Sequence, residues 1–173
     1  SELVVHDLLK NGYELASNEE GADIVLLNTC SVREQAEQKA IGKANHIISE
    51  NGKTKNVKLG VLGCMAQNRG SELIEDIRGV NLIVGTQKFH RVSEYLDQIF
   101  RDPKSNNTKP VIDLQEEEGS QNTINRHSHT HRNQVSAFVS IMQGCNMNCS
   151  FCIVPKTRGS ERYRVMDEIC DEI

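Results

Sequence analysis

Short apolar runs alternate with helical patterns through residues 1–100, and this alternation limits the possible folds more than any other feature. Helical patterns surround the runs at 3–12, 31–52, 71–77 and 89–100, and the runs themselves are 22–30 (ADIVLLNTC), 57–64 (VKLGVLGC) and 81–86 (NLIVGT). Strands that alternate with helices usually pair in parallel, with the helices covering the sheet. We therefore predict an α/β domain built on a parallel sheet, and we expect the strand at 22–30 to be buried on both faces.

Local signals indicate where two of these helices begin and end. Gly12 is expected to end the first helix. Ser31 and Glu34 have the spacing of a capping box, which predicts that the second helix begins at Ser31, and Gly52 is expected to end it.

Two cysteines lie where neighbouring predicted strands end. Cys30 closes the first run and Cys64 closes the second. The carboxyl ends of parallel strands lie at one edge of a sheet, where ligands bind in open α/β folds. Two thiols there are a candidate metal site, although a pair lacks one or two ligands and free cysteine is also a common small core residue. We favour metal ligation for this pair.

Three more cysteines fall within residues 144–152 (GCNMNCSFC), at Cys145, Cys149 and Cys152. We do not expect a disulfide framework, because the N-terminal residues have neither the basic leader nor the apolar core of a signal peptide. Structural zinc sites usually gather four ligands in pairs, and no fourth ligand is evident here. Three thiolates at i, i+4 and i+7 can hold three corners of an iron–sulfur cluster and leave one iron open.

Charge is modest but uneven. The chain has 20 Lys and Arg against 24 Asp and Glu, a net charge of −4, which is not typical of a nucleic-acid-binding protein. Residues 126–164 nevertheless carry six basic residues and one acid, so the remaining residues carry −9. The basic excess is either a solvated surface or a face near a phosphate backbone or an anionic cofactor. No apolar run approaches the roughly 18 residues of a membrane span, so we expect no membrane partner.

The second half of the chain begins with a polar segment. Residues 101–134 resemble a linker with one short strand at 110–114, and the alternating histidines at 127–131 are expected to be solvated instead of binding a metal. Residues 136–143 (SAFVSIMQ) are predicted to form a strand that leads into the cysteine loop. Cys170 lies in a helical pattern at 165–173, where we expect a buried thiol.

Several motifs together resemble the radical S-adenosylmethionine (SAM) methylthiotransferase family. They are NTCSVREQAEQKA (28–40), GVLGCMAQNRG (60–70), LIVGTQKFHRV (82–92) and AFVSIMQGCNMNCSFCIVPKTRGSE (137–161). The resemblance covers almost the whole chain. It implies a methylthiotransferase α/β domain at 1–100 that lacks its first strand, a linker at 101–134, and the beginning of a radical SAM partial β/α barrel at 135–173.

The resemblance implies two 4Fe-4S clusters and SAM as cofactors. Three cysteines match the ligands of the SAM-binding cluster: Cys145, Cys149 and Cys152. Cys30 and Cys64 match two of the three ligands of an auxiliary cluster, and the segment that carries the third ligand in the family is absent from this chain. No catalytic residue beyond the cluster ligands is indicated.

Other residues near the cysteine loop carry weaker indications. Phe151 either packs beside the cluster or SAM, or is an ordinary core aromatic. Tyr163 and Val165 depart from the pattern that the family usually shows after the loop, which weakens the choice of subfamily but not the interpretation of the cysteines.

Within the family, NTCSVRE and GCMAQ are most similar to enzymes that add a methylthio group to C2 of N6-isopentenyladenosine beside the tRNA anticodon. Two alternatives stay open: a sibling that modifies threonylcarbamoyl-adenosine in tRNA or an aspartate of a ribosomal protein, and a non-catalytic iron–sulfur or metal-binding module. The resemblance implies a tRNA partner and leaves the electron donor and sulfur source unspecified. We expect a cytoplasmic monomer, and we expect this chain, as an internal fragment, to be inactive by itself.

Overall fold

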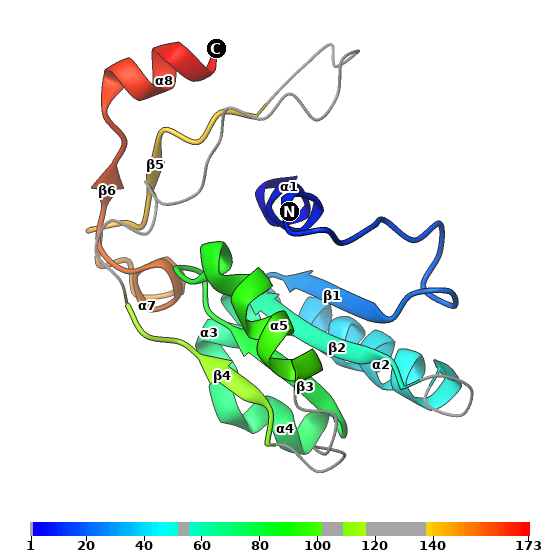
Figure 1. Ribbon diagram of the computed structural model, residues 1–173. Coiled ribbons are helices and arrows are strands. Elements are labelled where there is room, and N and C mark those ends of the chain that lie inside the picture. Colours follow the sequence, from blue (N-terminus) through cyan, green and yellow to red (C-terminus); the bar gives the residue numbers. More distant parts are fainter. Residues whose placement is uncertain (1, 52–55, 102–108, 117–137) are drawn as a thin grey trace.

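The computed structural model describes residues 2–51, 56–101, 109–116 and 138–173. Four strands form one parallel sheet in the order β1-β2-β3-β4 (Figure 1). The strands are β1 (Ile24–Thr29), β2 (Lys58–Gly63), β3 (Val80–Val84) and β4 (Val111–Asp113). The predicted α/β class and parallel sheet are therefore confirmed, and β4 confirms the short strand expected at 110–114.

Helices cover both faces of the sheet, with α2 and α5 on opposite faces (Figure 1). The longer helices are α1 (Glu2–Lys10), α2 (Glu34–Asn51) and α5 (Val92–Arg101). The shorter ones are α3 (Cys64–Arg69), α4 (Leu73–Asp76), α7 (Val154–Arg158) and α8 (Met166–Glu172), with 3-10 turns η1 (Gly70–Glu72) and η2 (Phe89–Arg91). The segment predicted as a helix at 71–77 thus begins as a 3-10 turn.

Alternation along β3 divides the core between the two faces. Ile83 packs with the α2, α3 and α4 side chains, whereas Leu82 and Val84 pack with those of α1 and α5. Successive side chains of a strand point to opposite faces, so a continuous apolar run supplies both layers. All three are fully buried, and each such side chain stabilises the fold by about 1.5–3 kcal/mol relative to an exposed one.

β1 differs from its prediction. It forms an edge of the sheet, and Ile24 to Leu27 are only half-buried. The expectation that residues 22–30 are buried on both faces is wrong. Among the residues that the structure describes, β2 alone pairs with this strand, and only part of its surface is covered.

Helix α2 begins later than the capping box predicts. Glu34 is its first residue, and the Arg33 carbonyl accepts from the Ala36 and Glu37 N–H groups at 3.0 and 3.3 Å. Ser31 is buried, and its hydroxyl donates to the Glu37 carboxylate instead of capping the helix. At the end of α1 the prediction holds: the helix ends at Lys10, and Gly12 has a φ of 86°.

The C-terminal segment packs against the sheet domain through α7, which contacts α3. Within residues 138–143 only Met142–Gln143 (β5) is extended in a ladder, antiparallel to Arg162–Tyr163 (β6), so the strand expected at 136–143 is much shorter than predicted. Cys170 is exposed on α8, and the buried-thiol prediction is wrong because α8 has no buried residue.

The histidines at 127–131 and most of the expected linker lie outside the described residues. Over the part of the chain that the structure describes, no helix combines the length and apolar character that crossing a membrane requires.

Candidate metal sites

Cys30 and Cys64 each follow the last residue of one of two neighbouring strands, at the carboxyl edge of the sheet. Thr29 and Gly63 are register partners at the ends of the parallel strands β1 and β2, and each cysteine is the next residue. The Thr29 hydroxyl also donates to the Leu62 carbonyl at 2.7 Å. The prediction that both strands end at one edge is therefore confirmed. Cys30 is exposed and Cys64 is 8% exposed, so the pair lies between the protein interior and solvent.

Gly63 permits this close approach. Its φ is 98°, and a Cβ there would lie 2.5 Å from the Thr29 carbonyl oxygen and 2.8 Å from Asn28 Oδ1. Any larger residue would force the strand ends apart or rotate the backbone that leads into Cys64. The glycine before Cys64 is thus a requirement of the geometry at this edge.

The cysteine loop at 144–152 is anchored on the segment that follows it. The Cys145 N–H donates to the Gly159 carbonyl, and the Cys152 N–H donates to the Cys149 carbonyl, each at 3.1 Å. Asn146 and Glu161 exchange two hydrogen bonds: the Asn146 N–H donates to Glu161 Oε1 at 3.2 Å, and the Glu161 N–H donates to Asn146 Oδ1 at 3.0 Å. Hydrogen bonds therefore fix the backbone of the loop at Cys145, Asn146 and Cys152.

The cysteines of this loop lie at the surface or partly beneath it. Cys149 is exposed, and Cys145 and Cys152 are half-buried. Phe151 is 91% exposed, so it is not a core aromatic. All six cysteines of the chain are free thiols. Among the residues with described positions, no three His, Cys, Asp or Glu side chains are grouped closely enough to hold a metal ion.

The donor set nevertheless fits an iron–sulfur cluster in chemical terms. Thiolates are the ligands that such clusters prefer, and the three thiols of the loop are neither buried in the core nor joined in disulfides. Cys30 and Cys64 supply two more thiols of the same kind. The structure thus places the predicted ligands in two groups, one on the loop and one at the sheet edge.

A contact between α7 and α3 joins the two groups. α7 begins two residues after Cys152, and α3 begins with Cys64. The Thr86 hydroxyl donates to the Thr157 carbonyl at 2.6 Å, and Thr157 is 2% exposed. Sequence reasoning assigned no role to VPKTRG (154–159), because nothing in its local pattern indicates which surface it packs on.

A cluster of charged side chains lies at the end of β4. Asp113 Oδ2 lies 3.8 Å from Lys88 Nζ and 3.7 Å from Arg91 Nη1, and it accepts a hydrogen bond from the Tyr95 hydroxyl. Burial, and then the bond to Asp113, raise the pKa of Tyr95 above its ordinary value. The group attaches β4 to η2 and α5, and sequence analysis did not find it because Asp113 lies far along the chain from its partners.

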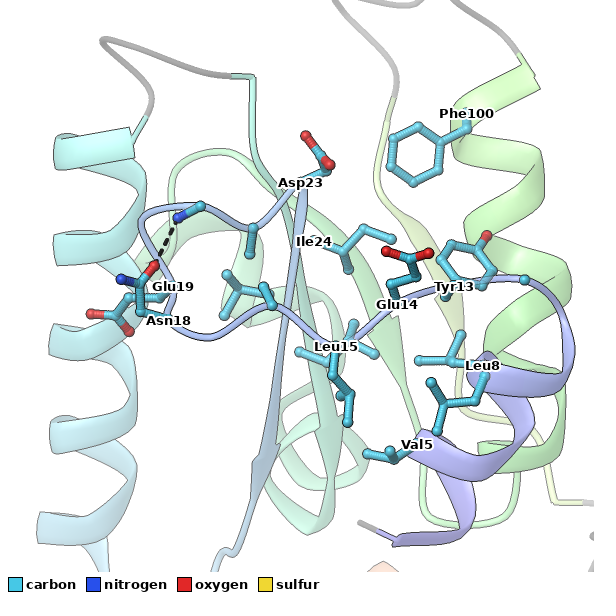
Figure 2. Close-up of a pocket in the computed structure, with 17 residues that line it drawn as sticks. Val5, Leu8, Tyr13, Glu14, Leu15, Asn18, Glu19, Asp23, Ile24 and Phe100 are labelled. Carbon is cyan, nitrogen blue, oxygen red and sulfur yellow. Dashed lines mark hydrogen bonds between the residues drawn. The ribbon is translucent and has the colours of Figure 1, made fainter. Parts of the chain in front are cut away.

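A cavity of about 890 Å³ lies elsewhere, between α1, the connection at 12–23 and the amino-terminal half of β1 (Figure 2). Leu8, Leu15, Ile24 and Phe100 line it with apolar surface. The cysteine pair lies beyond the opposite end of β1, so this cavity is not part of the candidate metal sites.

Comparison with known proteins identifies similar chains. Residues 1–85 match a family described as "Uncharacterized protein family UPF0004". The chain is 51% identical over 173 residues to a tRNA-2-methylthio-N(6)-dimethylallyladenosine synthase of Methylacidiphilum infernorum, covering 100% of this chain and 36% of that relative.

Two further relatives bear the same name. The synthase of Opitutus terrae is 48% identical over 195 residues, with 99% of this chain and 41% of the relative covered. That of Akkermansia muciniphila is 41% identical over 182 residues, with 100% and 40% covered. The chain is similar to these synthases over 99–100% of its own length. It spans between about a third and two fifths of the length of these curated relatives.

Proposed function

We propose that the chain is part of an enzyme that adds a methylthio group to C2 of N6-isopentenyladenosine (N6-dimethylallyladenosine) beside the anticodon of tRNA. The observation that carries the proposal is identity of 51% along the entire chain to a synthase named for this product. The partner is then tRNA, and a cytoplasmic location, where thiols stay reduced, suits the six free cysteines.

The cysteines divide between two proposed 4Fe-4S clusters. Cys145, Cys149 and Cys152 would hold one cluster whose fourth iron is open to SAM, in the segment that we propose to be the beginning of the radical SAM barrel. Cys30 and Cys64 would hold two corners of the second cluster. When bound, these groups supply the radical and sulfur chemistry of methylthio transfer.

The residues of this chain have the task of holding and orienting those groups. The pairing of Thr29 with Gly63 joins the two strand ends that precede Cys30 and Cys64, and the α3–α7 contact links this edge to the segment after the cysteine loop. The adenine C2–H has no acidic proton, so a general base would contribute little to its activation. This agrees with a site made chiefly of thiols.

Product analysis tests the proposal. We would express the protein at the full length of its relatives, replace Cys145, Cys149 and Cys152 by Ala, and analyse tRNA nucleosides by mass spectrometry. The expected result is complete loss of the methylthiolated nucleoside, whereas Cys170→Ala, a matched change at an exposed thiol, keeps it. Product formation by the triple variant would overturn the radical mechanism, and a product on threonylcarbamoyl-adenosine or on a ribosomal aspartate would assign the protein to a sibling.

Electron paramagnetic resonance separates this function from a non-catalytic metal module. After anaerobic reconstitution, about four irons per cluster are expected, and the signal of the loop cluster should change when SAM is added. Zinc without iron, or a loop cluster in the full-length protein whose signal ignores SAM, would contradict the proposed role of the loop.

A further inference from the structure

Ser31, the residue after Cys30, is hydrogen-bonded to two helices. It is 8% exposed, its hydroxyl donates to the Glu37 carboxylate of α2, and its Oγ accepts from Asn68 Nδ2 of α3 at 3.2 Å. One hydroxyl thus uses both its donor and its acceptor capacity inside the protein. The backbone beside Cys30 is tied to α2 and to α3 at the same point.

The network returns to the helix that carries Cys64. Arg69, the last residue of α3, places Nη1 3.8 Å from Glu37 Oε2 and Nη2 2.7 Å from Asp76 Oδ2. Glu37 is 9% exposed, and a buried carboxylate is tolerated when it is paired and hydrogen-bonded. Because Cys64 is the first residue of α3, the same short helix carries this thiol and, through Asn68, is hydrogen-bonded to Ser31 beside Cys30.

Cys30 needs such support because the sheet does not supply it. The β1–β2 ladder ends at Thr29, and Cys30 itself is exposed. The position of Cys30 relative to Cys64 therefore depends on its two neighbours. Thr29 is held in the β1–β2 ladder, and Ser31 is held by its hydrogen bonds to Glu37 and Asn68. Ligand groups must be held within about 0.5 Å of the productive geometry, and supporting hydrogen bonds do this in metal sites.

We propose that Glu37 and Asn68 are positioning residues that act through Ser31 to set the placement of the Cys30 thiol relative to Cys64. The proposal rests on the proposed function only in the use of the pair as cluster ligands. The placement of the two thiols is a property of this chain, and it can be measured without iron, SAM or tRNA.

A reagent that needs two neighbouring thiols measures this placement directly. We would replace Cys145, Cys149, Cys152 and Cys170 by Ser and measure the affinity of the remaining pair for phenylarsine oxide, which binds two thiols and releases water. Asn68→Ala is expected to weaken capture by about tenfold, the lower end of the effect of losing a supporting partner in metal sites. Glu37→Gln keeps an acceptor for the Ser31 hydroxyl and should lose less affinity than Glu37→Ala.

Asn45→Ala is the matched control. Asn45 is also half-buried, and its Nδ2 donates to the main-chain carbonyl of Asp76 at 2.8 Å, which joins α2 to the end of α4. This bond does not use the Asp76 carboxylate that pairs with Arg69. Its loss should leave capture within about twofold of the parent, although it removes one hydrogen bond of comparable strength. Urea unfolding of each variant shows that it is folded under the conditions of the measurement.

The outcomes separate this inference from the proposed function. Equal capture by folded Asn68→Ala and Asn45→Ala proteins would overturn the positioning role, as would no capture by the parent pair. The positioning role is supported if Asn68→Ala binds the arsenical more weakly than the parent and Asn45→Ala, and Glu37→Ala more weakly than Glu37→Gln. If the full-length protein then modifies no tRNA, only the proposed function is wrong. In the full-length protein, with Ala at the three loop cysteines, Asn68→Ala should also alter the resonance signal of the remaining cluster.

Discussion

Gly63 and Thr29 are register partners at the carboxyl ends of β2 and β1, and the space between them has no room for a side chain. The φ of 98° and ψ of −153° at Gly63 belong to a region that only glycine occupies readily. The same residue leads into Cys64, so backbone geometry and ligand placement depend on one position.

Replacement of Gly63 by Ala tests this relationship. We expect a loss of about 1–3 kcal/mol in unfolding free energy from the backbone conformation alone, and the collision with the Thr29 carbonyl adds to it. The measurement is urea unfolding, combined with the rate at which a thiol reagent labels Cys64. Labelling should become faster because the displaced strand end exposes this thiol.

Gly42→Ala is the control for Gly63→Ala. Gly42 lies inside α2, and a Cβ added there would have nothing within 4 Å, so alanine should stabilise the protein by about 0.5–1 kcal/mol. A destabilisation of similar size at both positions would show that the close approach of β1 and β2 does not explain the effect.

The hydroxyl of Thr86 is expected to hold α7 on the sheet domain. Thr86→Val keeps the shape but removes the donor to the buried Thr157 carbonyl, so amide hydrogen exchange in residues 153–159 should become faster by about five- to tenfold, as for the loss of roughly 1 kcal/mol. Ser49→Ala removes a hydroxyl–carbonyl bond within α2 and should leave that region unchanged. Unchanged exchange in Thr86→Val would mean that other contacts dock α7.

Asp113 is expected to stabilise the attachment of β4. Asp113→Ala removes the carboxylate that Lys88, Arg91 and Tyr95 approach, and Lys88 is 5% exposed. The loss of one partner from a buried ionic group should cost about 3 kcal/mol in urea unfolding. Glu94→Gln breaks only the exposed pair with Arg91 and should cost less than about 1 kcal/mol. Similar costs for the two variants would contradict a special role of Asp113.

We expect ionisation of Tyr13 to lower the free energy of unfolding in alkaline solution. Burial, and then the hydrogen bond from its hydroxyl to Asp97 Oδ1 at 2.8 Å, raise its pKa from 10.0 to about 12. Because the folded pKa lies above the unfolded one, the stabilisation is fully present below pH 10.0 and is lost as the pH rises to about 12. Urea unfolding across this range should show that Tyr13→Phe declines less steeply than the parent. Parallel declines would assign the effect to other groups.

The positions of the strands and of the cysteines followed from local pattern. A continuous apolar run such as 81–86 is recognisable because β3 contributes to both core layers, and its neighbours in the chain have helical periodicity. The sequence alone places Cys30 and Cys64 at one edge of the sheet, since parallel strands in one sheet end on the same side. Their use as ligands remains a prediction.

Predictions from local pattern were wrong for residues whose environment depends on distant parts of the chain. Ser31 and Glu34 have the spacing of a capping box, but the Ser31 hydroxyl is hydrogen-bonded to both Glu37 and Asn68 instead. The helix begins at Glu34. Cys170 belongs to a helix as predicted, yet helical periodicity does not say what covers the helix, and the thiol is exposed.

The sequence by itself determined the alternation of strands and helices, the parallel sheet and the two cysteine groups, because these depend on periodicity and spacing along the chain. Only the tertiary structure decided that β1 is an edge, that α7 packs on α3, and that Ser31 joins α2 to α3. These features arise from contacts between residues distant in sequence, whose choice of partner depends on which surfaces folding brings together.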